Sequence, residues 1–72
     1  MADAAFDSAA DRIQYSEAVD FVQQGRAHLV QPPLVELYVR KGLWRRQGNQ
    51  IELTEEGERQ HRIAVRERFS DG

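Results

Sequence analysis

Residues 34–58 read LVELYVRKGLWRRQGNQIELTEEGE, and this stretch contains the strongest structural signals in the chain. Apolar residues recur at helical spacing over 34–41, which predicts a short helix. Gly42 is a natural end for that helix, because glycine takes the left-handed conformation after a helix terminus at little cost. Arg40 and Lys41 would lie in its last turn, where cations match the helix dipole.

A β-hairpin is predicted over residues 43–54. Gly48 and Asn49 fit a two-residue type II′ turn, in which glycine supplies the positive φ. The resulting register pairs Gln47 with Gln50, Arg46 with Ile51, Arg45 with Glu52, and Trp44 with Leu53. One face then carries Trp44, Ile51 and Leu53, and the other carries Leu43, Arg45, Glu52 and Thr54. We therefore expect Trp44 to be buried across from Leu53 and Glu52 to neutralise part of the charge of Arg45.

The hairpin leads into a second helix, expected over residues 55–68. Thr54 is a suitable N-cap, and the acidic residues that follow it would lie at the positive end of the helix dipole. The apolar residues of this segment are too scattered to form one narrow stripe, so the helix is either mostly solvated or packs against a second copy of the chain. The expected contact residues are Ile63, Val65 and Phe69. Residues 70–72 read as a tail.

Two helices are expected before residue 26. The first has apolar residues at helical spacing: Ala2, Ala5, Phe6, Ala9, Ala10 and Ile13. Because four of these six are alanines, the helix over residues 1–14 is weakly ordered unless it docks on the rest. Ser16 is the predicted N-cap of a second helix over residues 17–24, which Gly25 would end.

The segment between the helices contains two prolines that interrupt any preceding element. Residues 27–30 are read as a short extended piece, which would give the hairpin a third short strand at its edge. Pro32 pushes its predecessor away from helical geometry, and Pro33 suits the first turn of the next helix. The order of elements predicts a small α+β domain that spans residues 1–72.

Composition narrows the functional classes. The 72 residues allow one small domain, and the absence of cysteine excludes disulfides and thiolate metal sites. His28 and His61 are far apart, and Glu58 with His61 makes one isolated pair, so no metal or cofactor is expected. The chain has neither a long apolar run nor a secretory signal, which predicts a soluble, cytoplasmic domain without membrane contact.

Charge is unevenly distributed along the chain. The whole chain has a net charge of −2, whereas residues 25–50 have five cations and one carboxylate, which makes +4. A local basic segment favours an anionic partner such as the phosphates of duplex DNA. The expected contacts are the cations Arg40, Lys41, Arg45 and Arg46 and the amides Gln47 and Asn49 near the hairpin turn. The alternative is a solvated helix end followed by a solvated strand.

Two motifs within residues 34–58 resemble winged-helix transcription regulators of the MarR and PadR kinds. They are the glycine, leucine, apolar residue and arginine at 42–45, and the Leu-Thr-x-x-Gly turn at 53–57. The resemblance covers about 25 residues of the chain. It implies that helix 34–41 is a recognition helix for the major groove and that the hairpin is a wing. It also implies a weak homodimer through the last helix.

Two functional hypotheses follow from these observations. The first is a DNA-binding domain of the transcription-regulator kind. The second is a protein-interaction module on the same fold, which uses apolar surface of its first or last helix and binds no nucleic acid. The sequence contains no glycine-rich phosphate loop, no cysteine nucleophile and no catalytic constellation, so we do not expect an enzyme.

Overall fold

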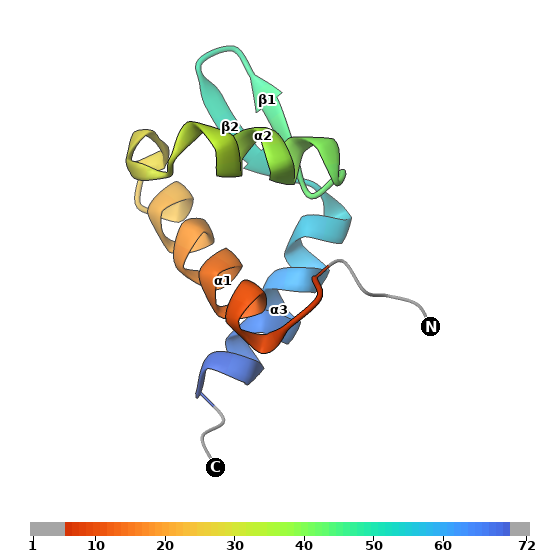
Figure 1. The fold of residues 1–72 in the computed structure, drawn as a ribbon. Coiled ribbons are helices and arrows are strands. Elements are labelled where there is room, and N and C mark those ends of the chain that lie inside the picture. Colours follow the sequence, from red (N-terminus) through yellow and green to blue (C-terminus); the bar gives the residue numbers. More distant parts are fainter. Residues whose placement is uncertain (1–5, 70–72) are drawn as a thin grey trace.

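The computed structural model describes residues 6–69, which form three α-helices, a short 3₁₀-helix and a two-stranded antiparallel hairpin. Along the chain these are α1 (Ala9–Gln23), η1 (Ala27–Leu29), α2 (Pro32–Arg40), β1 (Trp44–Gln47), β2 (Gln50–Leu53) and α3 (Glu55–Phe69). Helices α1 and α3 pack against each other, and α2 lies beside the hairpin at the opposite end of the molecule (Figure 1). The predicted α+β class is confirmed.

The predicted hairpin register is confirmed at all four pairs, from Trp44 opposite Leu53 to Gln47 opposite Gln50. Gly48 has φ +61°, and no non-glycine residue among residues 6–69 has positive φ, which is the pattern of a type II′ turn. Trp44 is 2% exposed, as predicted. A two-residue turn leaves the strands only one way to pair, which is why a local signal determined the register.

Leu43 departs from the expected alternation. It is buried, although strand periodicity placed it on the outer face with Arg45. Its N–H donates to the carbonyl of Tyr38 at 3.0 Å, and its own carbonyl accepts from the N–H of Thr54 at 2.9 Å. Leu43 therefore belongs to the connection between α2 and β1, where the two-residue period of a strand does not apply.

Helix α3 begins where the sequence predicted and ends one residue later. Thr54 is its N-cap, because Thr54 Oγ1 accepts from the N–H of Gly57 at 3.0 Å. The same hydroxyl lies 2.7 Å from the carbonyl oxygen of Gly42 and donates to it. Thr54 thus caps α3 and ties its first turn to the end of α2.

Among the described residues before Gly25, one helix is present where two were predicted. The N-cap of α1 is Ser8, whose hydroxyl accepts from the N–H of Asp11 at 3.2 Å. Ser16 is buried inside the helix, and its hydroxyl donates to the carbonyl of Ile13, so its predicted role as an N-cap is wrong. No glycine or proline separates the two predicted segments, and the helix therefore continues to Gln23. Part of the predicted helix over residues 1–14 lies outside the described residues.

The extended piece considered for residues 27–30 is instead the 3₁₀-helix η1. The N–H of Leu29 donates to Arg26 at 2.9 Å and that of Val30 donates to Ala27 at 3.0 Å, which is the three-residue spacing of such a turn. The sheet described within residues 6–69 accordingly has two strands, and the third strand is absent from it. Gln31 is the N-cap residue of α2, and the helix has proline in its first turn as expected.

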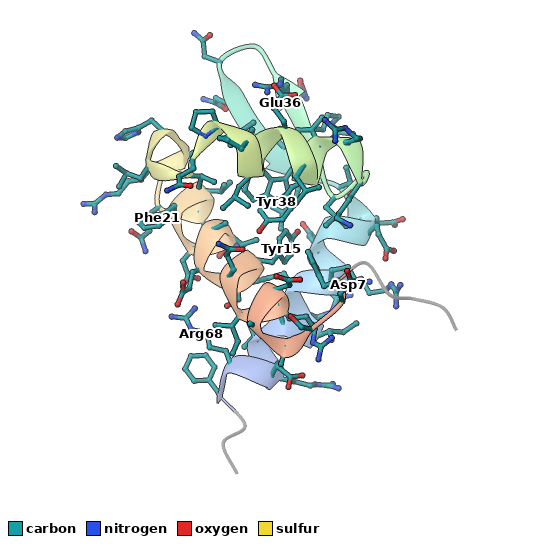
Figure 2. All side chains as sticks on the ribbon, in the orientation of Figure 1. Asp7, Tyr15, Phe21, Glu36, Tyr38 and Arg68 are labelled. Carbon is teal, nitrogen blue, oxygen red and sulfur yellow. The ribbon has the colours of Figure 1, made fainter. Side chains whose placement is uncertain are left out.

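The core is an aromatic cluster at the junction of α1, α2 and the hairpin. The ring centroid of Tyr38 lies 4.9 Å from those of Tyr15 and Trp44, and Phe6 packs on Tyr15 at 5.0 Å. Figure 2 shows Tyr15 and Tyr38 pointing into the space between their two helices. Because this cluster holds the end of α2 against the base of the hairpin, it positions the basic residues described next.

Candidate nucleic-acid interface

The basic end of α2 presents two of the predicted contact residues. Arg40 occupies the last turn, Lys41 is the C-cap residue, and both are exposed. Cations at this end of a helix interact favourably with its dipole, so they stabilise α2 while they gather positive charge. Gly42 follows with φ +79°, which glycine tolerates, and turns the chain directly into the hairpin.

The two arginines of β1 lie on opposite faces of the hairpin. Arg45 is on the outer face, where its Nη2 donates to Oε1 of Glu52, its cross-strand partner, at 3.0 Å. Nε2 of Gln47 donates to the same carboxylate oxygen at 3.4 Å. The predicted partial neutralisation of Arg45 by Glu52 is therefore present, and Gln47 shares in it.

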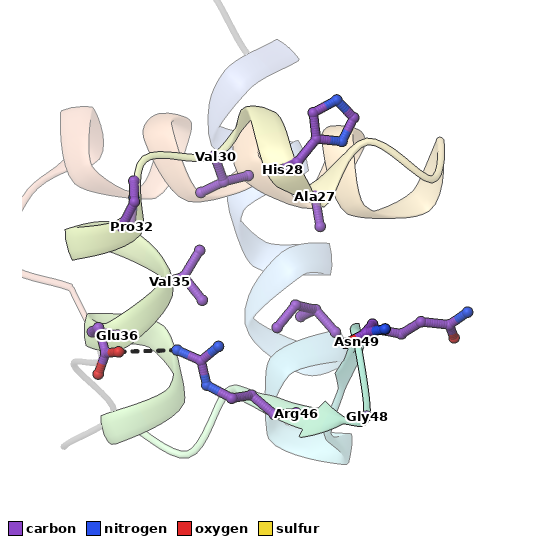
Figure 3. A pocket seen from close by; sticks show the side chains of 11 residues that line it. Ala27, His28, Val30, Pro32, Val35, Glu36, Arg46, Gly48 and Asn49 are labelled. Atoms are coloured by element: carbon purple, nitrogen blue, oxygen red, sulfur yellow. Dashed lines mark hydrogen bonds and ion pairs between the residues drawn. The ribbon is translucent and has the colours of Figure 1, made fainter.

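Arg46 faces α2, and its partner was not found from the sequence. Its Nη2 donates to Oε2 of Glu36 at 3.0 Å, so the ion pair bridges α2 and β1 (Figure 3). The two residues are ten positions apart and belong to different elements, so no local period relates them. The only available signal was that Glu36 is the single acidic residue within residues 25–50.

The name basic surface is used below for Arg40, Lys41, Arg45 and Arg46. With Glu36 and Glu52 included, four cations and two carboxylates give this region a net charge of +2. In both ion pairs the side chains are about half exposed. Exposed pairs of this kind contribute about 0–1 kcal/mol, so a phosphate can replace either carboxylate with little loss.

An open hollow of about 410 Å³ adjoins the basic surface between η1, α2 and the hairpin tip. Val30 and Val35 supply apolar wall, and the Glu36–Arg46 ion pair runs along one side (Figure 3). Asn49 at the tip belongs to the lining and, like Gln47, is exposed to solvent. Gln47 and Asn49 are thus accessible to an external partner. Asn49 lines the same hollow as Arg46, whose carboxylate partner Glu36 a phosphate can replace.

The predicted dimer residues lie at the other end of the molecule, on α3. Phe69 is 71% exposed and Ile63 is 36% exposed, whereas Val65 is half-buried. The structure therefore leaves Ile63 and Phe69 open to a partner and commits part of Val65 to the fold. The basic surface and these apolar side chains are separate features.

The two tyrosines whose pKa values are raised, Tyr15 and Tyr38, belong to the buried core. Burial raises the pKa of Tyr38 to about 12 and that of Tyr15 further, and both rings belong to the aromatic core. Tyr15 Oη donates to the carbonyl of Gly57 at 2.9 Å, which occupies its hydroxyl. Within residues 6–69, no three histidine, aspartate or glutamate side chains gather closely enough to hold a metal ion.

Comparison with known proteins adds no relative to these observations. Between residues 6 and 69, no helix combines the length and apolar composition that crossing a bilayer requires. No protein family, no curated protein and no solved structure matches the chain.

Proposed function

We propose that this domain binds duplex DNA through the basic surface, in the manner of a small winged-helix transcription regulator. One observation carries the proposal: Gly42 joins the cationic end of α2 directly to the hairpin, so four exposed cations lie between residues 40 and 46 on two adjoining elements, with Arg45 and Arg46 on opposite faces of the hairpin. Phosphate contacts dominate the affinity of proteins for DNA, and clustered cations on two rigid elements can follow a phosphate backbone.

The arrangement of elements supports the same proposal. A helix that is followed by a hairpin and a capped C-terminal helix corresponds to recognition helix, wing and closing helix in the resemblance noted above. Direct reading of bases requires arginine, asparagine or glutamine at an exposed position. Gln47 and Asn49 satisfy that requirement at the wing, whereas α2 exposes one such residue, Arg40, beside Glu36 and Leu37. We therefore expect weak binding with little sequence preference from a single domain.

The test is a fluorescence-anisotropy titration with a random duplex over a series of salt concentrations. Two to four neutralised phosphates give a slope of log K against log salt between about −2 and −4. Arg40→Ala should weaken binding and reduce the magnitude of that slope by about 1. Replacing all four residues of the basic surface by alanine should abolish binding at every salt concentration.

Arg26→Ala is the matched control, because Arg26 is an equally exposed arginine that precedes η1 and lies outside the basic surface. It should leave both the affinity and the salt slope unchanged. Equal losses from Arg40→Ala and Arg26→Ala would indicate attraction by overall charge alone. A parent protein that binds no duplex even in low salt would end the proposal.

The second candidate function is protein interaction, and the exposure of Ile63 and Phe69 favours it. We propose a weak homodimer that uses these residues with the exposed part of Val65. Apolar association survives added salt, whereas phosphate binding weakens steeply, so the two functions separate in one salt series. Sedimentation velocity at increasing protein concentration measures the association, and a monomer at high micromolar concentration would refute it.

A further inference from the structure

A groove runs between α1 and α2. It consists of two adjoining hollows of about 250 and 210 Å³, which share Gln14 as a lining residue. Its apolar lining comes from both helices, η1 and the residue Phe6 before α1: Phe6, Ala18, Phe21, Leu29, Leu34 and Leu37. Figure 2 labels Phe21 at one end and Asp7 at the other, with Tyr38 between them. This feature is called the α1–α2 groove below.

Carboxylates line the α1 side of the groove. Asp7, Asp11 and Glu17 are exposed lining residues, and none of the three makes an ion pair with another residue of 6–69. Lys41 is the cation on the opposite side, where its Nζ lies 5.8 Å from the centre of the Phe6 ring. An apolar floor with an acidic rim fits an amphipathic helix whose polar flank is basic.

The chain itself contains such a helix face. The C-terminal half of α3 exposes Arg62, Ile63, Arg66 and Phe69. Arg66 is four residues from Arg62 and three from both Ile63 and Phe69, so the four side chains neighbour one another on the helix surface. This set is called the α3 stripe. It combines two arginines with two large apolar side chains, and neither Arg62 nor Arg66 forms an ion pair within residues 6–69.

The exposed apolar residues divide evenly between these two surfaces. Four large apolar side chains of residues 6–69 are at least 36% exposed: Leu29, Leu37, Ile63 and Phe69. The first two line the α1–α2 groove, and the other two belong to the α3 stripe. Burying one pair against the other would remove all four from water at once, and the charges that flank each pair have opposite signs.

We propose that the α1–α2 groove receives the α3 stripe of a second copy of this chain. The proposal rests on the self-association proposed above and adds the surface that receives Ile63 and Phe69. A two-fold pair satisfies both halves, because each copy offers one groove and one stripe. The arginines of the stripe then lie along the acidic rim, which sets the direction in which the helix enters the groove.

A pair of charge-reversed variants tests this contact. The rim variant carries Asp7→Lys and Glu17→Lys, and the stripe variant carries Arg62→Glu and Arg66→Glu. In the rim variant alone, lysines would face arginines; in the stripe variant alone, glutamates would face carboxylates. Each should therefore associate about tenfold or more weakly than the parent in sedimentation velocity. Mixed in equal amounts, the two variants should associate at least as well as the parent, because both contacts of the mixed pair are again attractive.

The matched control reverses two exposed carboxylates of the first turn of α3, Glu55→Lys and Glu58→Lys, and changes the net charge by the same amount as the rim variant. It should associate like the parent. Circular dichroism and thermal melting establish that each variant is folded, and Leu37→Gln provides a second variant that weakens the groove without any change of charge.

The outcomes separate the groove from the association itself. Restored association in the mixture supports the proposal. A rim variant that dimerises like the parent, with a stripe variant that does not, overturns the groove and leaves a direct α3–α3 contact. A parent that stays monomeric at high micromolar concentration overturns both the groove and the proposed homodimer.

Discussion

Gly57→Ala tests the close packing of α3 against the connection between α2 and β1. Gly57 lies in the first turns of α3 and is buried against the connection between α2 and β1. A Cβ added there would overlap the carbonyl oxygen of Leu43 and lie 2.9 Å from its carbon and 3.2 Å from Tyr15 Oη. Two of these atoms are backbone, so relief requires a shift of α3 and not a change of rotamer.

Helix propensity, overpacking and a weakened hydrogen bond together determine the expected change in the free energy of unfolding. In an open helix, alanine in place of glycine stabilises by about 1 kcal/mol. Overpacking costs about 1–3 kcal/mol, and displacement of α3 weakens the buried hydrogen bond from Tyr15 to the Gly57 carbonyl, which costs about 1–3 kcal/mol more. The balance is a loss of about 1–5 kcal/mol in the free energy of unfolding. A domain of this length has about 4–11 kcal/mol in total.

Thermal melting followed by far-ultraviolet circular dichroism measures the loss, and urea unfolding followed by Trp44 fluorescence checks it. We expect the midpoint temperature to fall by at least about 4 °C. Glu58→Ala is the control, because that side chain is exposed on the same helix and its loss should cost less than about 1 kcal/mol. A Gly57→Ala protein that melts at or above the parent temperature would show that α3 does not press on Leu43.

Three further predictions concern Trp44, the N-cap of α3 and the two buried tyrosines. Trp44→Ala should cost about 3–5 kcal/mol in unfolding free energy, and the parent's emission should be blue-shifted from that of indole in water. Thr54→Ala should cost about 1–2 kcal/mol, and Thr54→Ser should recover most of it in the same melts, because serine keeps the capping hydroxyl. Burial raises the pKa of Tyr38 to about 12 and that of Tyr15 further. Their stabilising effect is therefore complete below the unfolded tyrosine pKa near 10 and is lost as pH rises through the folded values. Circular dichroism and tyrosinate absorbance should thus change together above pH 10, and a fold that persists while both tyrosines titrate at their ordinary pKa would contradict this.

Local sequence signals predicted the part of the fold from α2 to α3. Gly42 and Gly48 mark turns that depend only on neighbouring residues, and Thr54 caps the helix that follows it directly. The prediction at Ser16 was wrong because a hydroxyl that can cap a helix can equally bond inside one. Ser16 Oγ accepts from Arg68 at 3.3 Å, fifty-two residues along the chain, and that contact is invisible to any local pattern.

The candidate interface was predictable only where neighbouring residues determine it. The register that pairs Arg45 with Glu52 follows from the turn, so this ion pair could be foreseen. The Glu36–Arg46 ion pair depends on the angle at which α2 meets the hairpin, which the aromatic core determines and no spacing encodes. The α1–α2 groove also depends on that angle, because its walls come from helices joined through η1.

The closed base of the hairpin makes its tip replaceable. Thr54 fastens the two ends of the hairpin together through its bonds to Gly42 and Leu43, and Trp44 anchors the first strand in the core. The turn residues Gly48 and Asn49 are exposed at the far end of the hairpin, and each doubling of a loop costs only about 0.6 kcal/mol in closure entropy. Longer or differently charged sequences can thus be inserted between Gln47 and Gln50 while the scaffold keeps its shape. The tip is accordingly the position at which substitutions or insertions can change the binding partner of this domain while the fold is retained.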